Sequence, residues 1–202
     1  MKSAISTLVG FGLAAALCAG AGLAQTPAPA PAAAPPTPEY FAIHMETTVD
    51  KSAKDTWAKV GAFCDLGTWL KIDCKITSGT GDVGSVRGIA GGRVTEVMTA
   101  KSEFGYGYTQ PAVMGKWYNL YHGFLEAVQD PKSKNKSKLV YTLMLDESDK
   151  ADQAAKDKDV ANRRKQFEGA LANMKAIAEG KPLPGAAPAA APATPAKPTK
   201  PN

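Results

Sequence analysis

The chain has 202 residues, of which 44% are hydrophobic, and its 24 basic and 19 acidic residues give a formal net charge of +5. The basic residues gather at 132–138, at 163–165 and near the end of the chain, not beside aromatic residues on one face, which argues against nucleic-acid binding. With two histidines and no cysteines or carboxylates at ligand spacing, the sequence also argues against a catalytic metal, and we expect no cofactor.

Residues 1–24 have the pattern of a signal peptide. Lys2 gives the basic start, residues 8–19 an apolar stretch, and Gly22-Leu23-Ala24 a cleavage site of the small-residue type. The apolar stretch is shorter than the roughly 20 residues that span a bilayer, so we expect no stable membrane insertion. The sequence therefore predicts a secreted protein, located in the periplasm.

Two segments rich in proline and alanine, 25–39 and 181–202, flank the rest of the chain. Such segments favour extended conformations and cannot bury a core. They are expected to be disordered tails, or alternatively spacers that contact another protein of the cell envelope. Residues 40–180 remain, and they have the right size for one domain with a single core.

The domain is expected to start with a strand and two short helices. Residues 40–49 alternate apolar and polar side chains, which indicates a strand with one buried face. Asp50 or Ser52 then caps a helix over 53–63, and 65–69 form a second short helix or turn.

Short strands follow one another up to a long closing helix. The expected strands cover 75–78, 84–89, 93–100, 104–110, 118–128 and 139–145. The Gly91-Gly92 pair predicts a hairpin, because glycine readily adopts positive φ. From Val160 apolar residues recur with helical spacing, at Phe167, Ala170, Leu171, Met174, Ile177 and Ala178. One helix across a curved antiparallel sheet must fill the space between them or enclose a cavity, so we predict an α+β container.

This order of elements resembles the helix-grip superfamily (SRPBCC, or START-like), which contains polyketide cyclases, START lipid-transfer domains, the pollen allergen Bet v 1 and plant abscisic acid receptors. The likeness covers residues 40–179 and rests on the segments 48–50, 54–57, 84–87, 95–98 and 104–109 together with Trp69, Cys74 and Tyr121. The resemblance implies a helix-grip fold: a curved seven-stranded antiparallel sheet, two short helices and a long C-terminal helix that together enclose an apolar pocket.

Glu96 is the candidate for chemistry. Strand alternation places Glu96 on the same face as Val94 and Met98, and the resemblance places the matching position in the pocket. A carboxylate there can accept a ligand hydroxyl or act as a base. The alternative is a glutamate on the outer face, paired with Arg87 or Arg93, because an alternation pattern shifts by one residue easily.

The tyrosines of the strands can supply polar groups to a pocket, although each can equally serve in packing. They are Tyr106, Tyr108, Tyr118, Tyr121 and Tyr141. We expect Trp69 and Trp117, which are near loops, at the cavity mouth and Trp57 in the core. His44 and His122 alternate away from the apolar faces of their strands, so we expect them at the surface.

Two cysteines follow the signal segment, and they suggest a covalent link. Cys64 and Cys74 do not have the spacing of a metal site, so a disulfide is expected in an oxidising compartment. The alternative is two buried thiols that act as small apolar side chains.

The leading hypothesis is an exported protein that binds a small hydrophobic or amphipathic ligand of the lipid, terpenoid or polyketide class between the sheet and the C-terminal helix. The expected ligand-binding residues are Phe41, Ile43, Met45, Trp69, Val94, Glu96, Met98, Tyr108, Tyr121, Leu125, Phe167, Leu171 and Met174. One alternative is an enzyme of the cyclase or aromatase type with Glu96 or His122 as its acid–base group. The other is an interaction domain whose cavity is filled by its own side chains.

Overall fold

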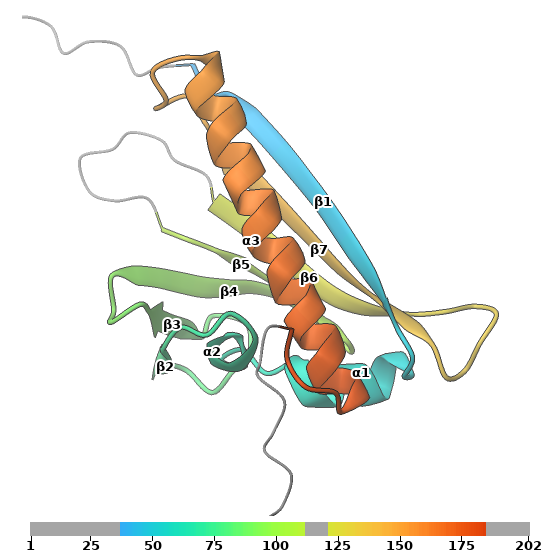
Figure 1. Ribbon diagram of the computed structural model, residues 1–202. Coiled ribbons are helices and arrows are strands. Elements are labelled where there is room, and N and C mark those ends of the chain that lie inside the picture. The colour runs from blue at the N-terminus through green and yellow to red at the C-terminus, as the bar shows by residue number, and fades with distance from the viewer. Residues whose placement is uncertain (1–36, 112–120, 185–202) are drawn as a thin grey trace, which may run out of the picture. The chain divides into compact units, whose positions relative to one another are not determined.

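The computed structural model describes residues 37–111 and 121–184, which form one antiparallel sheet with a long helix across one face (Figure 1). The strands are β1 (Tyr40–Val49), β2 (Cys74–Ser78), β3 (Val86–Ile89), β4 (Val94–Ser102), β5 (Gly105–Thr109), β6 (Tyr121–Gln129) and β7 (Ser137–Asp146). The helices are α1 (Ala53–Val60), α2 (Leu66–Trp69) and α3 (Gln153–Glu179). The seven strands lie in the order β1-β7-β6-β5-β4-β3-β2, so β1 and β2 are the two edges. The predicted α+β architecture is confirmed.

The helix α1 is shorter than the sequence predicts. Ser52, one of the two expected caps, accepts a hydrogen bond from the amide of Asp55 at 3.0 Å. The helix ends before Phe63 because Gly61 takes the C-cap position and donates its amide hydrogen to the carbonyl of Trp57. The Trp57 ring lies against Gly61, where a β-carbon would come within 2.4 Å of it, so the turn depends on glycine.

The helix α3 starts earlier than its apolar stripe. Asp152 is the N-cap and accepts a hydrogen bond from the amide of Ala155 at 2.8 Å, whereas the stripe begins at Val160. Its last residue is followed by Gly180, which has a φ of 68° and ends the helix in the left-handed conformation. No helix of the described residues is both long and apolar enough to cross a membrane.

The strands follow the expected segments apart from small differences at their ends. Residues 118–120, expected in the sixth strand, lie outside the described residues, as do the predicted signal peptide and most of both Pro/Ala-rich segments. The inward-facing prediction for Glu96 and Met98 is correct, because both are buried on β4. On β6, Leu125 and Ala127 are buried.

One half of the concave face is closely packed against α3. We call it the closed half; it is built around side chains of β1, β6, β7 and α3 that are at most 3% exposed, among them Ile43, Met45, Leu125, Leu139, Leu143, Leu171 and Met174. Two α3 side chains also fasten the helix to the edge strand, because Arg164 donates to the carbonyl of His44 at 3.2 Å and Lys175 to that of Thr48 at 2.6 Å. Each fully buried aliphatic side chain contributes about 1.5–3 kcal/mol to folding.

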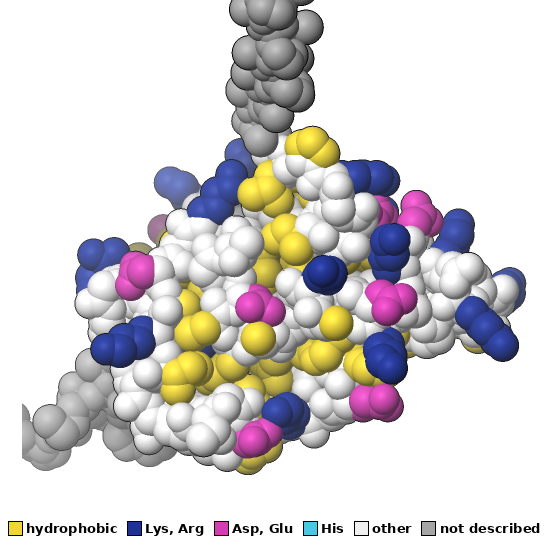
Figure 2. Space-filling view, turned by 90° about the horizontal axis from the view of Figure 1, so that it is seen from below, with side chains coloured by type: hydrophobic (Ala, Val, Ile, Leu, Met, Phe, Trp, Pro, Cys, Tyr) yellow, Lys and Arg dark blue, Asp and Glu magenta, His cyan; other side chains and the backbone are white. Residues whose placement is uncertain are grey.

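The surface seen from below mixes charges of both signs. Figure 2 shows hydrophobic side chains in the middle of this face, with Lys and Arg interspersed among Asp and Glu around them. The described part of this face therefore carries no continuous basic patch.

Candidate functional site

A cavity of about 250 Å³ lies in the other half of the concave face, which we call the cavity half, between β3, β4 and β5, the α2 segment and α3. Its apolar lining consists of Leu66, Trp69, Leu70, Ile72, Ile89, Ala90, Val94 and Phe167. Its polar lining consists of Arg87, Glu96, Tyr108, Gln110, Tyr121, Tyr141, Arg163 and Gln166. The cavity therefore joins an apolar wall to an unusual number of hydrogen-bonding groups, as binding sites for small molecules do.

A buried ion pair forms part of the wall. The side chains of Arg87 and Glu96 are 2% and 4% exposed, and Oε2 of Glu96 accepts from Nε of Arg87 at 2.8 Å and pairs with Nη2 at 2.6 Å. Register places these two residues directly opposite each other on β3 and β4. The other carboxylate oxygen, Oε1, accepts a hydrogen bond from Nε2 of Gln110 at 3.0 Å. Both oxygens of Glu96 are thus already engaged.

The environment of Arg87 keeps its guanidinium charged. Burial alone would lower the pKa of Arg87, but Tyr106 and Glu96 beside it raise that pKa above its ordinary value. The guanidinium carbon lies 4.1 Å from the ring centroid of Phe63 and 4.9 Å from that of Tyr108, which are cation–π distances. Nη1 donates to the carbonyl of Phe63.

Three tyrosines supply phenol groups to the cavity. The hydroxyls of Tyr108 and Tyr141 are hydrogen-bonded to each other at 2.7 Å, and the ring of Tyr121 lies 6.3 Å from that of Tyr108. Gly123 leaves room for this arrangement, because a β-carbon there would come within 2.3 Å of the Tyr108 ring. Burial raises the pKa of Tyr121 to about 12 and that of Tyr108 and Tyr141 well above the usual value of 10. All three therefore remain neutral hydroxyls near pH 7.

The helix α3 contributes one polar corner to the cavity. Arg163, Gln166 and Phe167 are three and four residues apart, so they share one face of the helix. The Phe167 ring packs edge-on against Tyr141 with centroids 4.8 Å apart. The guanidinium carbon of Arg163 lies 5.3 Å from the Tyr121 centroid, and Nε of Arg163 donates to Asp159 at 3.3 Å.

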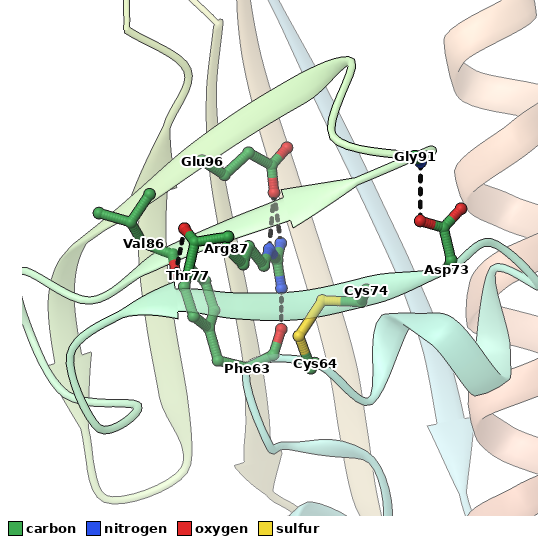
Figure 3. The surroundings of a disulfide bond; sticks show 9 residues. All are labelled: Phe63, Cys64, Asp73, Cys74, Thr77, Val86, Arg87, Gly91 and Glu96. Atoms are coloured by element: carbon green, nitrogen blue, oxygen red, sulfur yellow. Dashed lines mark hydrogen bonds and ion pairs between the residues drawn. A yellow bond between two sulfur atoms is a disulfide. The ribbon is translucent and has the colours of Figure 1, made fainter.

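A disulfide holds the segment that supports Arg87. Cys64 and Cys74 are bonded with their Cα atoms 5.4 Å apart, which ties the α1–α2 connection to the start of β2 (Figure 3). Phe63, the neighbour of Cys64, gives both its carbonyl and its ring to Arg87. Of the two alternatives for these cysteines, the disulfide is the one that the structure contains. Figure 3 shows Arg87 between its two partners, the carboxylate of Glu96 and the carbonyl of Phe63, with the disulfide next to Phe63.

Solved structures of the same architecture were found at low sequence identity. The chain is similar to Ara h 8.0201, with a TM-score of 0.51 and 16% identity over 71% of this chain and 100% of that one. It is also similar to the protein XoxI from Bacillus cereus, with a TM-score of 0.50 and 17% identity over 69% and 93% of the two chains. The chain has a Bet v 1-like helix-grip fold.

A weaker similarity, to an uncharacterised protein from Bacillus thuringiensis, has a TM-score of 0.47 and 17% identity over 65% of this chain and 98% of that one. Comparison of the sequence with protein-family models and with curated proteins gives no match. At 16% and 17% identity, the similarities to Ara h 8.0201 and XoxI show the fold and nothing about the ligand.

Eleven of the thirteen predicted ligand-binding residues of this helix-grip domain separate into two groups, and Phe41 and Met98 belong to neither. Those that line the cavity are Trp69, Val94, Glu96, Tyr108, Tyr121 and Phe167. Those that belong to the closed half are Ile43, Met45, Leu125, Leu171 and Met174, and they do not reach the cavity because α3 packs directly on β1 and β7. Phe41 is half-buried on the outer end of β1, and Met98 lines a separate cleft of about 380 Å³ beside α1.

Several finer expectations need correction. Glu96 faces inward as predicted, yet it also pairs with Arg87, so the expected pairing occurs inside the domain and not on the outer face. Trp69 is 1% exposed and belongs to the cavity wall, not to its mouth. Trp117 and Tyr118 lie outside the described residues. Trp57 packs against the core as expected.

The histidines and acidic groups do not build a further site. His44 is exposed, with its Nδ1 3.2 Å from the hydroxyl of Thr142, and neither it nor His122 lines the cavity. Among residues 37–111 and 121–184, no group of three His, Cys, Asp or Glu side chains is placed to hold a metal ion.

Sequence reasoning did not assign Arg87, Gln110, Arg163 and Gln166 to the cavity. A signal for Arg87 existed, because it alternates with the buried residues Ser85 and Ile89 and so shares their inward face. Arg163 has no such signal, because a basic residue on a helix next to Arg164 is typical of a solvated surface.

Proposed function

We propose that this protein binds a compact, largely apolar molecule with at least one polar group in the cavity half of the domain. The observation that carries the proposal is a cavity of about 250 Å³ next to the close-packed closed half, with a buried carboxylate, an amide and phenols in its wall. Burial of apolar ligand surface would supply most of the affinity, at about 25 cal/mol per Å² before association costs.

The volume limits the size of the ligand. An engineered apolar cavity of about 150 Å³ accommodates benzene. A cavity of about 250 Å³ therefore suits one ring or two fused rings, and it is small for a long acyl chain or a steroid. Of the lipid, terpenoid and polyketide-like ligands predicted from the sequence, the compact ring compounds fit best.

The chemistry of the wall favours binding over catalysis. Glu96 is already balanced by Arg87 and hydrogen-bonded to Gln110, so its use as a base would require breaking a buried pair. The phenols of Tyr108 and Tyr141 have pKa values raised by burial, which makes them donors and not bases near pH 7. These groups can orient a ligand hydroxyl or carbonyl without reacting with it.

Calorimetric titration of the purified protein with 2-naphthol, and with palmitate for comparison, tests the proposal. We expect saturable one-to-one binding of 2-naphthol, weak or no binding of palmitate, and a rise in melting temperature with 2-naphthol. Val94→Trp fills the cavity and should weaken 2-naphthol binding at least tenfold. Val83→Trp is the matched control, because Val83 is 60% exposed and lies away from the cavity.

The proposal fails if no ring compound binds the wild-type protein, or if Val94→Trp binds 2-naphthol as tightly as Val83→Trp does. Either result would favour an interaction domain that does not use the cavity.

We further propose that the protein works after export, in an oxidising compartment. Support comes from the signal-like residues 1–24 and from the Cys64–Cys74 disulfide, a bond typical of exported proteins. Expression with the natural start in a bacterium with two membranes should yield a periplasmic product that begins at Gln25 and has no free thiol. A cytoplasmic product that keeps Lys2 would contradict export. A contact between the Pro/Ala-rich segments and an envelope protein stays a prediction.

A further inference from the structure

Two arginines line the cavity, and they differ in how many of their guanidinium nitrogens are already hydrogen-bonded or ion-paired. Arg87 is saturated: Nε and Nη2 contact Glu96 and Nη1 donates to the carbonyl of Phe63. Arg163 has one hydrogen bond to a carboxylate, from Nε to Asp159 at 3.3 Å, and it also interacts with the phenol of Tyr121. Asp159 is not part of the cavity lining.

The lining therefore has an excess of positive charge. Glu96 is its one carboxylate and is taken by Arg87, so Arg163 is the cation left for a ligand. The contact between Arg163 and Asp159 is a single hydrogen bond between neighbouring turns of α3, at 3.3 Å, and the side chains are 37% and 27% exposed. A second anion can join Arg163 without first displacing a strong partner.

The position of Arg163 suits an anionic group at the edge of the cavity. Its side chain is 37% exposed, against 2% for Arg87, so an anion here would keep part of its hydration and avoid the full cost of burying a charge. The two Nη groups form a fork that matches a carboxylate in a bidentate manner. The neutral hydroxyl of Tyr121, over whose ring Arg163 lies, provides a further donor nearby.

We propose that the ligand is a compact ring-bearing carboxylate, with its ring between Trp69 and Phe167 and its carboxylate on the Nη groups of Arg163. This inference rests on the proposed function and narrows it to an anionic class. The ring fills the apolar part of the lining, and the carboxylate stays at the exposed side of the cavity.

Three probes of one shape and different charge test this assignment: 2-naphthoate, the neutral 2-naphthamide and the cationic 2-naphthylmethylammonium. Each is titrated by calorimetry into wild type, Arg163→Gln, Arg163→Lys and Arg164→Gln. Arg164 is the matched control, because it is the next residue of α3 but bonds to the carbonyl of His44 and does not line the cavity. Melting temperatures of all four proteins confirm that they are folded.

In the wild type we expect 2-naphthoate to bind at least about tenfold more tightly than 2-naphthamide, and the cation to bind most weakly. Arg163→Gln should bring the ratio of the two affinities to about one while leaving 2-naphthamide binding unchanged. Arg163→Lys should retain part of the preference, and Arg164→Gln should retain all of it.

Equal binding of 2-naphthoate and 2-naphthamide by the wild type, or an unchanged preference in Arg163→Gln, would overturn the carboxylate assignment and leave the proposed binding function intact. Failure of all three probes to bind the wild type would overturn both.

Discussion

The closed half and the cavity half share one sheet and one helix, yet they are built on different principles. In the closed half, aliphatic side chains such as Ile43, Leu143 and Met174 are completely buried against one another. In the cavity half, the equivalent inward positions of β3 and β4 carry Arg87 and Glu96. Stability is thus concentrated on one side, and the other side is left with space and charge.

This division shows why a helix-grip domain can keep an imperfectly packed region. A void and a buried ion pair both lower the stability that the same volume of aliphatic packing would provide. The closed half compensates, because α3 is fixed there to β1 by apolar contacts and by the hydrogen bonds of Arg164 and Lys175. The helix is held along one half while its Arg163 and Phe167 face open space in the other.

The largest expected effect comes from breaking the ion pair of the cavity half. Glu96→Gln leaves the charge of Arg87 buried without its counter-charge, and we expect a loss of about 3–5 kcal/mol in the free energy of unfolding. Urea denaturation followed by circular dichroism measures it.

The double variant Arg87→Met/Glu96→Met is the control for that loss, since it removes both charges and should recover most of the stability. A loss below about 1 kcal/mol in Glu96→Gln would mean that the pair does not organise this half.

A second variant separates the two halves by their effect on binding. Leu171→Ala removes a side chain that is 2% exposed in the closed half, so we expect a loss of about 3 kcal/mol in stability and an unchanged affinity for 2-naphthol. Phe167→Leu, one helical turn earlier in the cavity wall, should lower stability less and change the affinity. If Leu171→Ala weakens binding as much as Phe167→Leu does, the two halves are not independent.

The extent to which the structure could be predicted from the sequence differs between the closed half and the cavity half. Alternation on β1 and β4 and the helical stripe of α3 identified the inward positions, since each period reflects the geometry of its own element. Periodicity cannot tell whether an inward side chain meets another side chain or empty space. Phe167 and Leu171 are both inward on α3, yet only Phe167 lines the cavity.

The polar part of the cavity was harder to predict for the same reason. The Arg87–Glu96 pair depends on the register between β3 and β4, and the Gln110 contact depends on where the chain leaves β5. Arg163 sits where α3 passes over Tyr121, a crossing that no local pattern encodes. The Cys64–Cys74 link could be anticipated because the chain has few cysteines and its start resembles an export signal.

The smallest expected effect concerns acid stability and belongs to the end of α3. Burial alone would raise the pKa of Glu179, but the amide of Asp50 at 2.9 Å and the ammonium groups of Lys175 and Lys181 lower it to about 2. The ordinary value is 4.5, so the folded state binds this proton less well than the unfolded state does. The stabilising contribution is therefore complete above about pH 5 and is lost as the pH falls from 4.5 towards 2.

Glu179→Gln should accordingly lower stability at pH 7 and flatten the decrease of stability between pH 5 and pH 2, measured by urea denaturation across that range.

Glu147 should affect acid stability in the opposite direction, because burial and the nearby Asp159 raise its pKa above 4.5 despite Lys150. Its contribution is present at low pH and is lost as the pH rises through its raised pKa, so Glu147→Gln should make the acid-side decrease steeper. If the slope of stability against pH is the same in both variants, neither carboxylate governs acid unfolding. Glu179 joins α3 to the residue that follows β1, beside the closed half. A flatter curve for Glu179→Gln alone would therefore place the acid-sensitive contacts on that side of the domain and away from the cavity.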